Sequence, residues 1–438
     1  MSVLIENAFV VTLDDRGVMG DFAVVVEAGR IAELGPIDAL RARHAGAERV
    51  NADGRLLMPG LVNAHLHAEL HALKGVVEEL DLHGWVRADR LNRGLHALGL
   101  EECRWIQRVA IRAALAEAVL AGTTTVATYG VTLGADDVAA EEITRIGMRG
   151  HVAIRDVRFA PARGATGEPV IPASRLDPPR MYRLHAEEAL DRAELDAAVA
   201  AHRRGERLIM HAAETRQRVH LARLRFGAST IRMLARADLL SDRVLLSHAV
   251  HVDDEEAGLI ADAGAVVISS PAAEMKLADG IAPITRYLER GITVALGTDA
   301  AICNNSTDMF LECRQLGLVQ KLAVGPAAIP AERILRCATA GGAQALGMAG
   351  TVGAIEPGRA ADLILIDTDN PRVQPLVHRA DFSNVAANLV FAATGQDVTD
   401  VMVGGEWVVR NRRIRTVDQA EIAAQLARAA SMLYDRIG

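Results

Sequence analysis

Long uninterrupted apolar runs are missing from this chain of 438 residues, although half of its residues are hydrophobic. None approaches the roughly 20 residues that cross a bilayer as a helix. The N-terminal stretch MSVLIENAFVVTLDD reaches Glu6 before a signal-peptide core is complete. Cysteine is also scarce, and its four copies show neither disulfide nor metal-ribbon spacing. These absences exclude a membrane-embedded or disulfide-rich secreted protein and predict a cytoplasmic one.

Concentrated positive charge is absent as well. The net charge is −8, and the acidity is spread along the chain without a basic stripe, so a nucleic-acid partner is not expected. We expect a small-molecule ligand instead and, because twofold assemblies are common, a homodimer. The length suits one large α/β domain with a smaller one.

The two ends of the chain share a residue pattern that is absent from the middle. Stretches such as SVLIENAFVVTLDD and GRAADLILIDTD alternate apolar and polar residues, as short antiparallel strands do. Gly404-Gly405 stands where a two-residue hairpin turn would lie. We therefore predict a small β-sandwich built from both termini (residues 1–57 and 351–415), followed by a C-terminal helix (416–438).

The middle of the chain, residues 58–350, alternates short apolar strands with amphipathic helical stretches. This rhythm predicts a (β/α)₈ TIM-type barrel. The sequence pattern is weakest for the fourth strand. This strand follows an irregular loop, Ala160–Pro179, which we expect to form part of the wall of the site. The predicted strands are LLMPGLVNAHLH, TTTVATYG, HVAIRDVRF, MYRLHA, RLIMHAAE, RVLLSHAVH, AVVISSP and TVALGTDA.

Residues with metal-binding or acid–base chemistry stand at the ends of these strands. His65 and His67 are two apart on a strand, so they point to the same side and can hold one ion. A His-x-His pair alone can equally well only pack or hydrogen-bond. Here, however, HAAE, SHAVH and GTDAAICNN also follow at strand ends, which meet at one face of a barrel. His211 and Asp299 would then complete a metal site.

These stretches resemble the amidohydrolase superfamily, in particular the branch of triazine hydrolases and S-adenosylhomocysteine/methylthioadenosine deaminases. The likeness covers nearly the whole chain and is densest in PGLVNAHLH, IMHAAET, LLSHAVHVDDEE, MKLADGIAPI and ALGTDAAICNNSTDMFLE. It implies metal ligands at His65, His67, His211 and Asp299. It also implies that Glu214 is the proton shuttle and that His248 orients the attacking water.

Lysine scarcity bears on the number of metals. Dinuclear members of the superfamily generally bridge their ions with a carboxylated lysine on a middle strand. Between Lys74 and Lys276 this chain has none, and Lys74 lies in the loop after the first strand. We therefore expect one divalent transition metal per chain, with zinc as the first candidate and iron as the alternative.

The chemistry of these groups suggests a reaction. A metal at this site would acidify water, Asp299 could accept the proton, and Glu214 could protonate a ring nitrogen as the adjacent carbon is attacked. The leading hypothesis is a hydrolytic deaminase of an amino-substituted N-heterocycle, most simply an adenosine-type nucleoside or thioether. A hydrolase of a triazine, pterin or urea-like substrate with another leaving group is the alternative, and a catalytically silent scaffold is the third.

Substrate contacts are less sharply marked in the sequence. His185 lies near the end of the fourth strand, but RLHAEEALD lacks the Pro-His-x-Pro-Tyr pattern usual in relatives. Trp85 could stack on a planar substrate, although a tryptophan there could equally anchor a helix. Glu69 could contact a polar group or be solvated, and Asn304 belongs to the motif after Asp299. We include these four residues as candidate substrate contacts.

Overall fold

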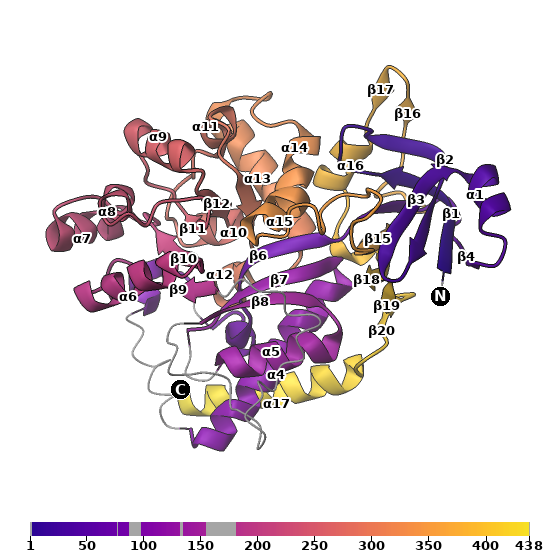
Figure 1. Ribbon diagram of the computed structural model, residues 1–438. Coiled ribbons are helices and arrows are strands. Elements are labelled where there is room, and N and C mark those ends of the chain that lie inside the picture. Colours follow the sequence, from indigo (N-terminus) through magenta and orange to yellow (C-terminus); the bar gives the residue numbers. More distant parts are fainter. Residues whose placement is uncertain (1, 77, 87–97, 132–134, 155–180, 438) are drawn as a thin grey trace.

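The computed structural model describes residues 2–76, 78–86, 98–131, 135–154 and 181–437. Figure 1 shows a parallel barrel surrounded by helices and, beside it, a smaller sheet where indigo strands from the N-terminus meet yellow strands from near the C-terminus. This arrangement is the predicted fold class, a (β/α)₈ barrel with a small β structure built from both ends of the chain.

The small sheet is held together by pairing between distant parts of the chain. Strand β5 runs antiparallel to β15, with Leu57 opposite Leu365, and β1 lies between β5 and β2. Side chains from these strands, including Ile5 and Leu363, form one buried apolar cluster. In the described residues the strands form one continuous sheet rather than two separate ones. They are β1 (Ser2–Val11), β2 (Val18–Glu27), β3 (Arg30–Pro36), β4 (Glu48–Asn51), β5 (Leu56–Pro59), β15 (Leu363–Ile366), β18 (Val398–Val403), β19 (Glu406–Arg410) and β20 (Arg413–Ile414).

The predicted glycine turn joins β18 to β19. Val403 pairs with Glu406 across it, so Gly404 and Gly405 alone form the connection. Their φ angles of +56° and +80° lie in the left-handed region that the favoured two-residue hairpin turn requires at both positions. The hairpin prediction is confirmed.

The barrel consists of parallel strands in the order in which they occur along the chain. The eighth strand is interrupted: β13 pairs with β12, whereas β14, two residues later, pairs with β6 and closes the ring. The strands are β6 (Leu61–His67), β7 (Thr123–Tyr129), β8 (Arg149–Ile154), β9 (Met181–Arg183), β10 (Arg207–Ala212), β11 (Val244–His248), β12 (Val266–Ser269), β13 (Val294–Leu296) and β14 (Asp299–Ala300).

Helices cover the outside of the barrel (Figure 1). Helix α17 (Gln419–Ile437), at the predicted C-terminal position, packs against α4, and α16 (Val385–Phe391) packs against α13 and α14. In the described residues, no helix is long and apolar enough to span a membrane. A small hairpin is formed by β16 (His378–Arg379) and β17 (Phe382–Ser383). The other described helical segments are α1 (Ile37–Arg43), η1 (Ala68–Leu73), α2 (Leu82–Val86), α4 (Leu100–Leu120), α5 (Ala135–Ile146), α6 (Arg192–Arg203), α7 (Arg216–Phe226), α8 (Thr230–Arg236), α9 (Asp254–Ala263), α10 (Pro271–Lys276), α11 (Ile284–Glu289), α12 (Ala301–Asn304), α13 (Met309–Val324), α14 (Ala331–Arg336), η2 (Cys337–Gly341), α15 (Gly342–Ala345) and η3 (Gly395–Asp397).

Gly297 stands in the interruption of the eighth strand and permits a close approach. A Cβ atom at this position would lie 2.6 Å from the Cβ of His65 and 2.8 Å from its backbone nitrogen and oxygen. We expect Gly297→Ala to lower the free energy of unfolding by about 1–3 kcal/mol and to reduce metal content, because His65 must move. Thermal unfolding and elemental analysis measure both effects.

The control for this substitution is Gly46→Ala, since a Cβ there would meet no atom within 4 Å. We expect that variant to differ from the wild type by less than about 0.5 kcal/mol. Equal stability and metal content in the two variants would contradict the steric argument.

Candidate active site

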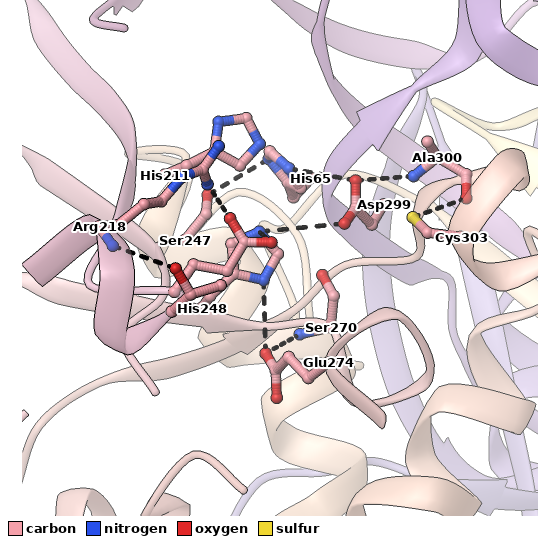
Figure 2. Close-up of polar contacts among 12 residues, drawn as sticks. His65, His211, Arg218, Ser247, His248, Ser270, Glu274, Asp299, Ala300 and Cys303 are labelled. Carbon is pink, nitrogen blue, oxygen red and sulfur yellow. Dashed lines mark hydrogen bonds and ion pairs between the residues drawn. The ribbon is translucent and has the colours of Figure 1, made fainter. Parts of the chain in front are cut away.

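Four predicted metal ligands meet at the carboxyl ends of the barrel strands. His65 and His67 come from β6, His211 from β10 and Asp299 from β14, and one ligand atom of each lies within 4.8 Å of the others. The Nε2 atoms of His67 and His211 are 3.2 Å apart, and Oδ1 of Asp299 lies 3.3 Å from Nε2 of His67 and 3.7 Å from Nε2 of His65. Figure 2 shows His65, His211 and Asp299 converging from opposite sides. The four side chains can share one ion.

The protonation chemistry of these groups fits a metal. Nε2 of His65 is buried without a hydrogen-bond partner, while its Nδ1 lies 3.3 Å from the hydroxyl of Ser247, which orients the ring. Burial lowers the pKa of His65 and of His211 well below the ordinary value, so both rings are neutral. Burial alone would raise the pKa of Asp299, but the neighbouring His67 and a hydrogen bond from the backbone amide of Ala300 lower it. Neutral imidazoles and an ionised carboxylate are the forms that bind a divalent metal.

The backbone at the site adopts conformations that side chains other than glycine rarely take. Asp299 has a φ of +58°, His248 of +72° and Ala213 of +50°. Such conformations cost of order 1–3 kcal/mol each and persist where the surroundings enforce them, often at functional sites. One such restraint is Asn63, whose side chain accepts a hydrogen bond from the amide of Thr298 (3.1 Å) and donates one to its hydroxyl (2.7 Å). Asn63, within PGLVNAH, had no role assigned from the sequence; its signal is an amide in the apolar run that precedes His65.

His248 lies among three carboxylates. Its Nε2 is 3.7 Å from Oε1 of Glu214 and 3.9 Å from Oδ2 of Asp299, and its Nδ1 is 3.6 Å from Oε1 of Glu274. Burial by itself would lower the pKa of His248, but these negative charges, beginning with Glu214, raise it to about 10. Glu274 accepts in turn a hydrogen bond of 2.8 Å from the backbone amide of Ser270, one of the contacts drawn in Figure 2. Glu274, on α10, was missed because nothing in its local sequence distinguishes it from a helical surface residue.

Glu214 stands between β10 and α7 and is only 2% exposed. Its Oε2 accepts a hydrogen bond from Arg218, and its Oε1 faces His248. It does not belong to the four-residue group that could hold a metal. Its carboxylate therefore adjoins the metal site as a separate acid–base group.

A buried tyrosine also contacts the histidines. The ring of Tyr129, at the end of β7, lies 4.5 Å from that of His211, 5.2 Å from that of His67 and 5.6 Å from that of His65, centre to centre. Its hydroxyl donates to the backbone oxygen of Leu184. Tyr129 was not proposed from the sequence, where its only signal is its position at the end of the second barrel strand.

The four candidate substrate contacts have different surroundings. Glu69 is buried and accepts a hydrogen bond from the amide of Val131 at 2.6 Å. Nδ1 of His185 lies 2.7 Å from Glu194, a residue of α6. The structure thus pairs Glu69 and His185 with groups of the protein itself.

Asn304 also bonds within the protein. It donates hydrogen bonds of 2.7 Å to the backbone oxygen of Thr298 and to Oε1 of Glu312. Trp85 falls in α2, but its side chain lies outside the described part of the chain, as does the whole loop from Ala160 to Pro179.

Glu312 makes stability depend on pH. It is fully buried, and burial raises its pKa from 4.5 to about 8. The folded protein therefore holds this proton more tightly than the unfolded chain. The contribution of this bound proton to the free energy of unfolding is fully present below about pH 4.5. It is lost as the pH rises through about 8, the pKa of Glu312 in the folded protein. We expect Glu312→Gln, which cannot ionise, to raise the melting temperature relative to the wild type at pH 8.5 and to change it less at pH 5.

Thermal melts of both proteins across pH 4.5–9 measure this difference. Glutamine keeps the shape of the side chain and can still accept the hydrogen bond from Asn304, but it cannot also accept the one that the backbone amide of Ala272 donates to Glu312 at 3.2 Å. That loss is the same at every pH, so the change of the difference with pH reports the ionisation of Glu312. A constant difference in melting temperature at every pH would show that ionisation of Glu312 is not the cause.

Comparison with known proteins places this site in a family. The amidohydrolase family model matches residues 56–408, which is most of the chain and includes all four candidate ligands. The chain belongs to the amidohydrolase family. Curated relatives of this amidohydrolase include the 5-methylthioadenosine/S-adenosylhomocysteine deaminase of Desulforudis audaxviator, 33% identical over all of both chains. The protein of that name from Halobacterium salinarum is 35% identical over 96% of this chain and 95% of its own.

Solved structures agree with the fold of this amidohydrolase. An adenosine deaminase from Xanthomonas campestris with bound zinc matches with a TM-score of 0.88 and 29% identity, over 99% of this chain and 98% of that one. An atrazine chlorohydrolase from Arthrobacter aurescens, complexed with zinc and atraton, matches with a TM-score of 0.82 and 25% identity, over 98% and 100%. The same architecture thus serves a deaminase and a chlorohydrolase, and a likeness of fold alone does not choose between their reactions.

Proposed function

We propose that this amidohydrolase is a hydrolytic deaminase that removes ammonia from an amino-substituted N-heterocycle, with one zinc ion per chain. The observation that supports this most is the juxtaposition of Glu214, His248 and Asp299 beside a donor set of three imidazoles and one carboxylate. Deamination of a cyclic amidine needs an activated water at the carbon and a proton donor within hydrogen-bond reach of the adjacent ring nitrogen.

The residues that would hold the zinc are His65, His67, His211 and Asp299. Three imidazoles with one carboxylate form a donor set typical of zinc. When bound there, the ion acidifies water and so supplies a nucleophile near neutral pH.

Asp299, His248 and Glu214 would each have a separate part in the proton transfers. Asp299 and His248 lie 3.9 Å apart and can hydrogen-bond the incoming water from two sides, which fixes its direction of attack. Oε1 of Glu214, which faces His248, is placed to carry a proton to the ring nitrogen next to the carbon that is attacked. Asp299 could pass the proton that it takes from the water to the exocyclic nitrogen, so that the carbon–nitrogen bond breaks and ammonia leaves. The proton of the new hydroxyl group would return to Glu214 as the carbonyl forms.

Relatives narrow the substrate that we propose. Curated proteins named 5-methylthioadenosine/S-adenosylhomocysteine deaminase match 96–100% of this chain at 33–35% identity. We therefore propose an adenosine-type nucleoside or thioether. Hydrolysis of a triazine-like compound with another leaving group is the second candidate, because an atrazine chlorohydrolase shares the fold over 98% of this chain.

A screen for released ammonia tests the proposal. Zinc-loaded protein is incubated with adenosine, 5-methylthioadenosine, S-adenosylhomocysteine, guanine, cytosine, a pterin and aminotriazines, and ammonia is measured together with the ultraviolet band of each heterocycle. We expect ammonia from adenosine-type compounds in step with the loss of that band. Release of chloride or an alkylamine from triazines, without ammonia from any purine, would favour the second candidate.

A further inference from the structure

The segment after β9 supplies two adjacent glutamates, Glu187 and Glu188. Glu187 is fully buried, and its Oε1 accepts hydrogen bonds from the amide of Ala213 (2.8 Å) and the hydroxyl of Thr230 (2.5 Å). Glu188 accepts two hydrogen bonds from Arg218, one of them from Nε at 2.8 Å. Both glutamates therefore bind the stretch of chain that carries Glu214.

Arg218 connects this segment to the proton shuttle. It lies in the first turn of α7, where its amide donates to the side chain of the N-cap residue Thr215 at 3.1 Å, and its own side chain is only 6% exposed. Nε and Nη2 bond Glu188, while Nη1 donates to Oε2 of Glu214. The guanidinium is a rigid planar fork, so holding one edge on Glu188 sets the direction of the remaining N–H group.

This geometry distinguishes the two oxygens of Glu214. Oε2 is occupied by Arg218, whereas Oε1 faces Nε2 of His248 at 3.7 Å. A free glutamate side chain rotates about three bonds, and ordering it costs free energy at each turnover. A partner that holds one oxygen leaves the other directed at the reacting atoms.

We propose that Arg218, held by Glu188, is a positioning residue that fixes Glu214 with Oε1 toward the substrate. The inference rests on the proposed function of Glu214 as proton shuttle. Arg218 does not itself touch the reacting atoms; it acts through the carboxylate that does.

The test is a double-mutant cycle. Arg218→Met removes all donors but keeps much of the length of the side chain. We expect kcat to fall about 10- to 100-fold, the scale expected for a misplaced catalytic group, with KM and metal content nearly unchanged. In a Glu214→Gln background the same substitution should cost little more, because the shuttle is already lost. Arg218→Lys, which keeps the charge but not the fork, should recover only part of the rate.

Two further variants separate positioning from folding. Arg223→Met changes an exposed arginine on the same helix and should leave kcat unchanged. If Arg218→Met unfolds because the half-buried Glu188 loses its partner, the double variant Glu188→Gln/Arg218→Met removes that charge and still lacks the fork.

Two outcomes would overturn the inference. One is a folded Arg218→Met protein with kcat within twofold of the wild type. The other is an equal loss of rate in the wild-type and Glu214→Gln backgrounds, which indicates a general structural role. A crystal structure of the Arg218→Met protein tests the positioning role of Arg218 independently of activity. If the inference holds, Oε1 of Glu214 no longer faces His248 in that structure. A wild type that releases ammonia from no compound would contradict the proposed function, while this structural result would still decide the role of Arg218.

Discussion

Asp299→Ala is expected to release the metal and lower turnover by about 10³- to 10⁴-fold, because a metal-activated water supplies several kcal/mol of transition-state stabilisation. Asp299 provides the only carboxylate in the four-residue group. Without it, three neutral imidazoles would hold a divalent cation with no compensating negative charge. His211→Ala removes a ligand from the opposite side of the barrel and should have a similar effect.

Elemental analysis of purified protein, paired with the ammonia assay, measures both losses. The wild type should carry close to one divalent transition metal per chain. Asp196→Ala is a suitable control, since that carboxylate is 67% exposed on α6 and lies outside the site. Two tightly held ions in the wild type would contradict the mononuclear site, and an active protein without metal would contradict the site altogether.

Glu214→Gln is expected to separate catalysis from metal binding. The amide keeps the shape of the side chain and can still accept a hydrogen bond from Arg218, but it cannot carry a proton. We expect kcat to fall by about 10²–10⁴-fold, the usual contribution of a general acid or base. Metal content and melting temperature should change little, because Glu214 does not belong to the metal-binding group.

Steady-state kinetics with the best substrate from the screen measure this effect, and Glu289→Gln on α11, which is exposed, is the control. The loss should be smaller for a substrate whose leaving group needs no protonation. If Glu214→Gln turns over the amino-heterocycle at nearly the wild-type rate with its metal in place, then Glu214 has a structural role and the ring-protonation mechanism is wrong.

Much of the architecture follows from local sequence. The eight barrel strands are short apolar runs with helical periodicity between them, and strands buried on both faces need such runs. The glycine pair at 404–405 determines its hairpin, because few other residues accept left-handed φ at two successive positions. The convergence of His65, His67, His211 and Asp299 could also be predicted, because the carboxyl ends of all barrel strands lie at one face.

The orientation of the catalytic groups was decided only by the tertiary structure. Glu274 reaches His248 from α10, and Arg218 bonds both Glu214 and Glu188, the latter 30 residues earlier in the chain. These contacts depend on rotamers and on helix placement, which have no periodic signal in the sequence. Likewise, Asn304 and Glu69 carry the polar chemistry of a substrate contact, yet the fold pairs each with a nearby protein group. Sequence alone determined which strand-end ligands arrive at the site, because strand ends are readable from the hydrophobic pattern. Packing determined which helix residues join them and which of their atoms meet, because buried polar groups pair with whatever neighbour the fold provides.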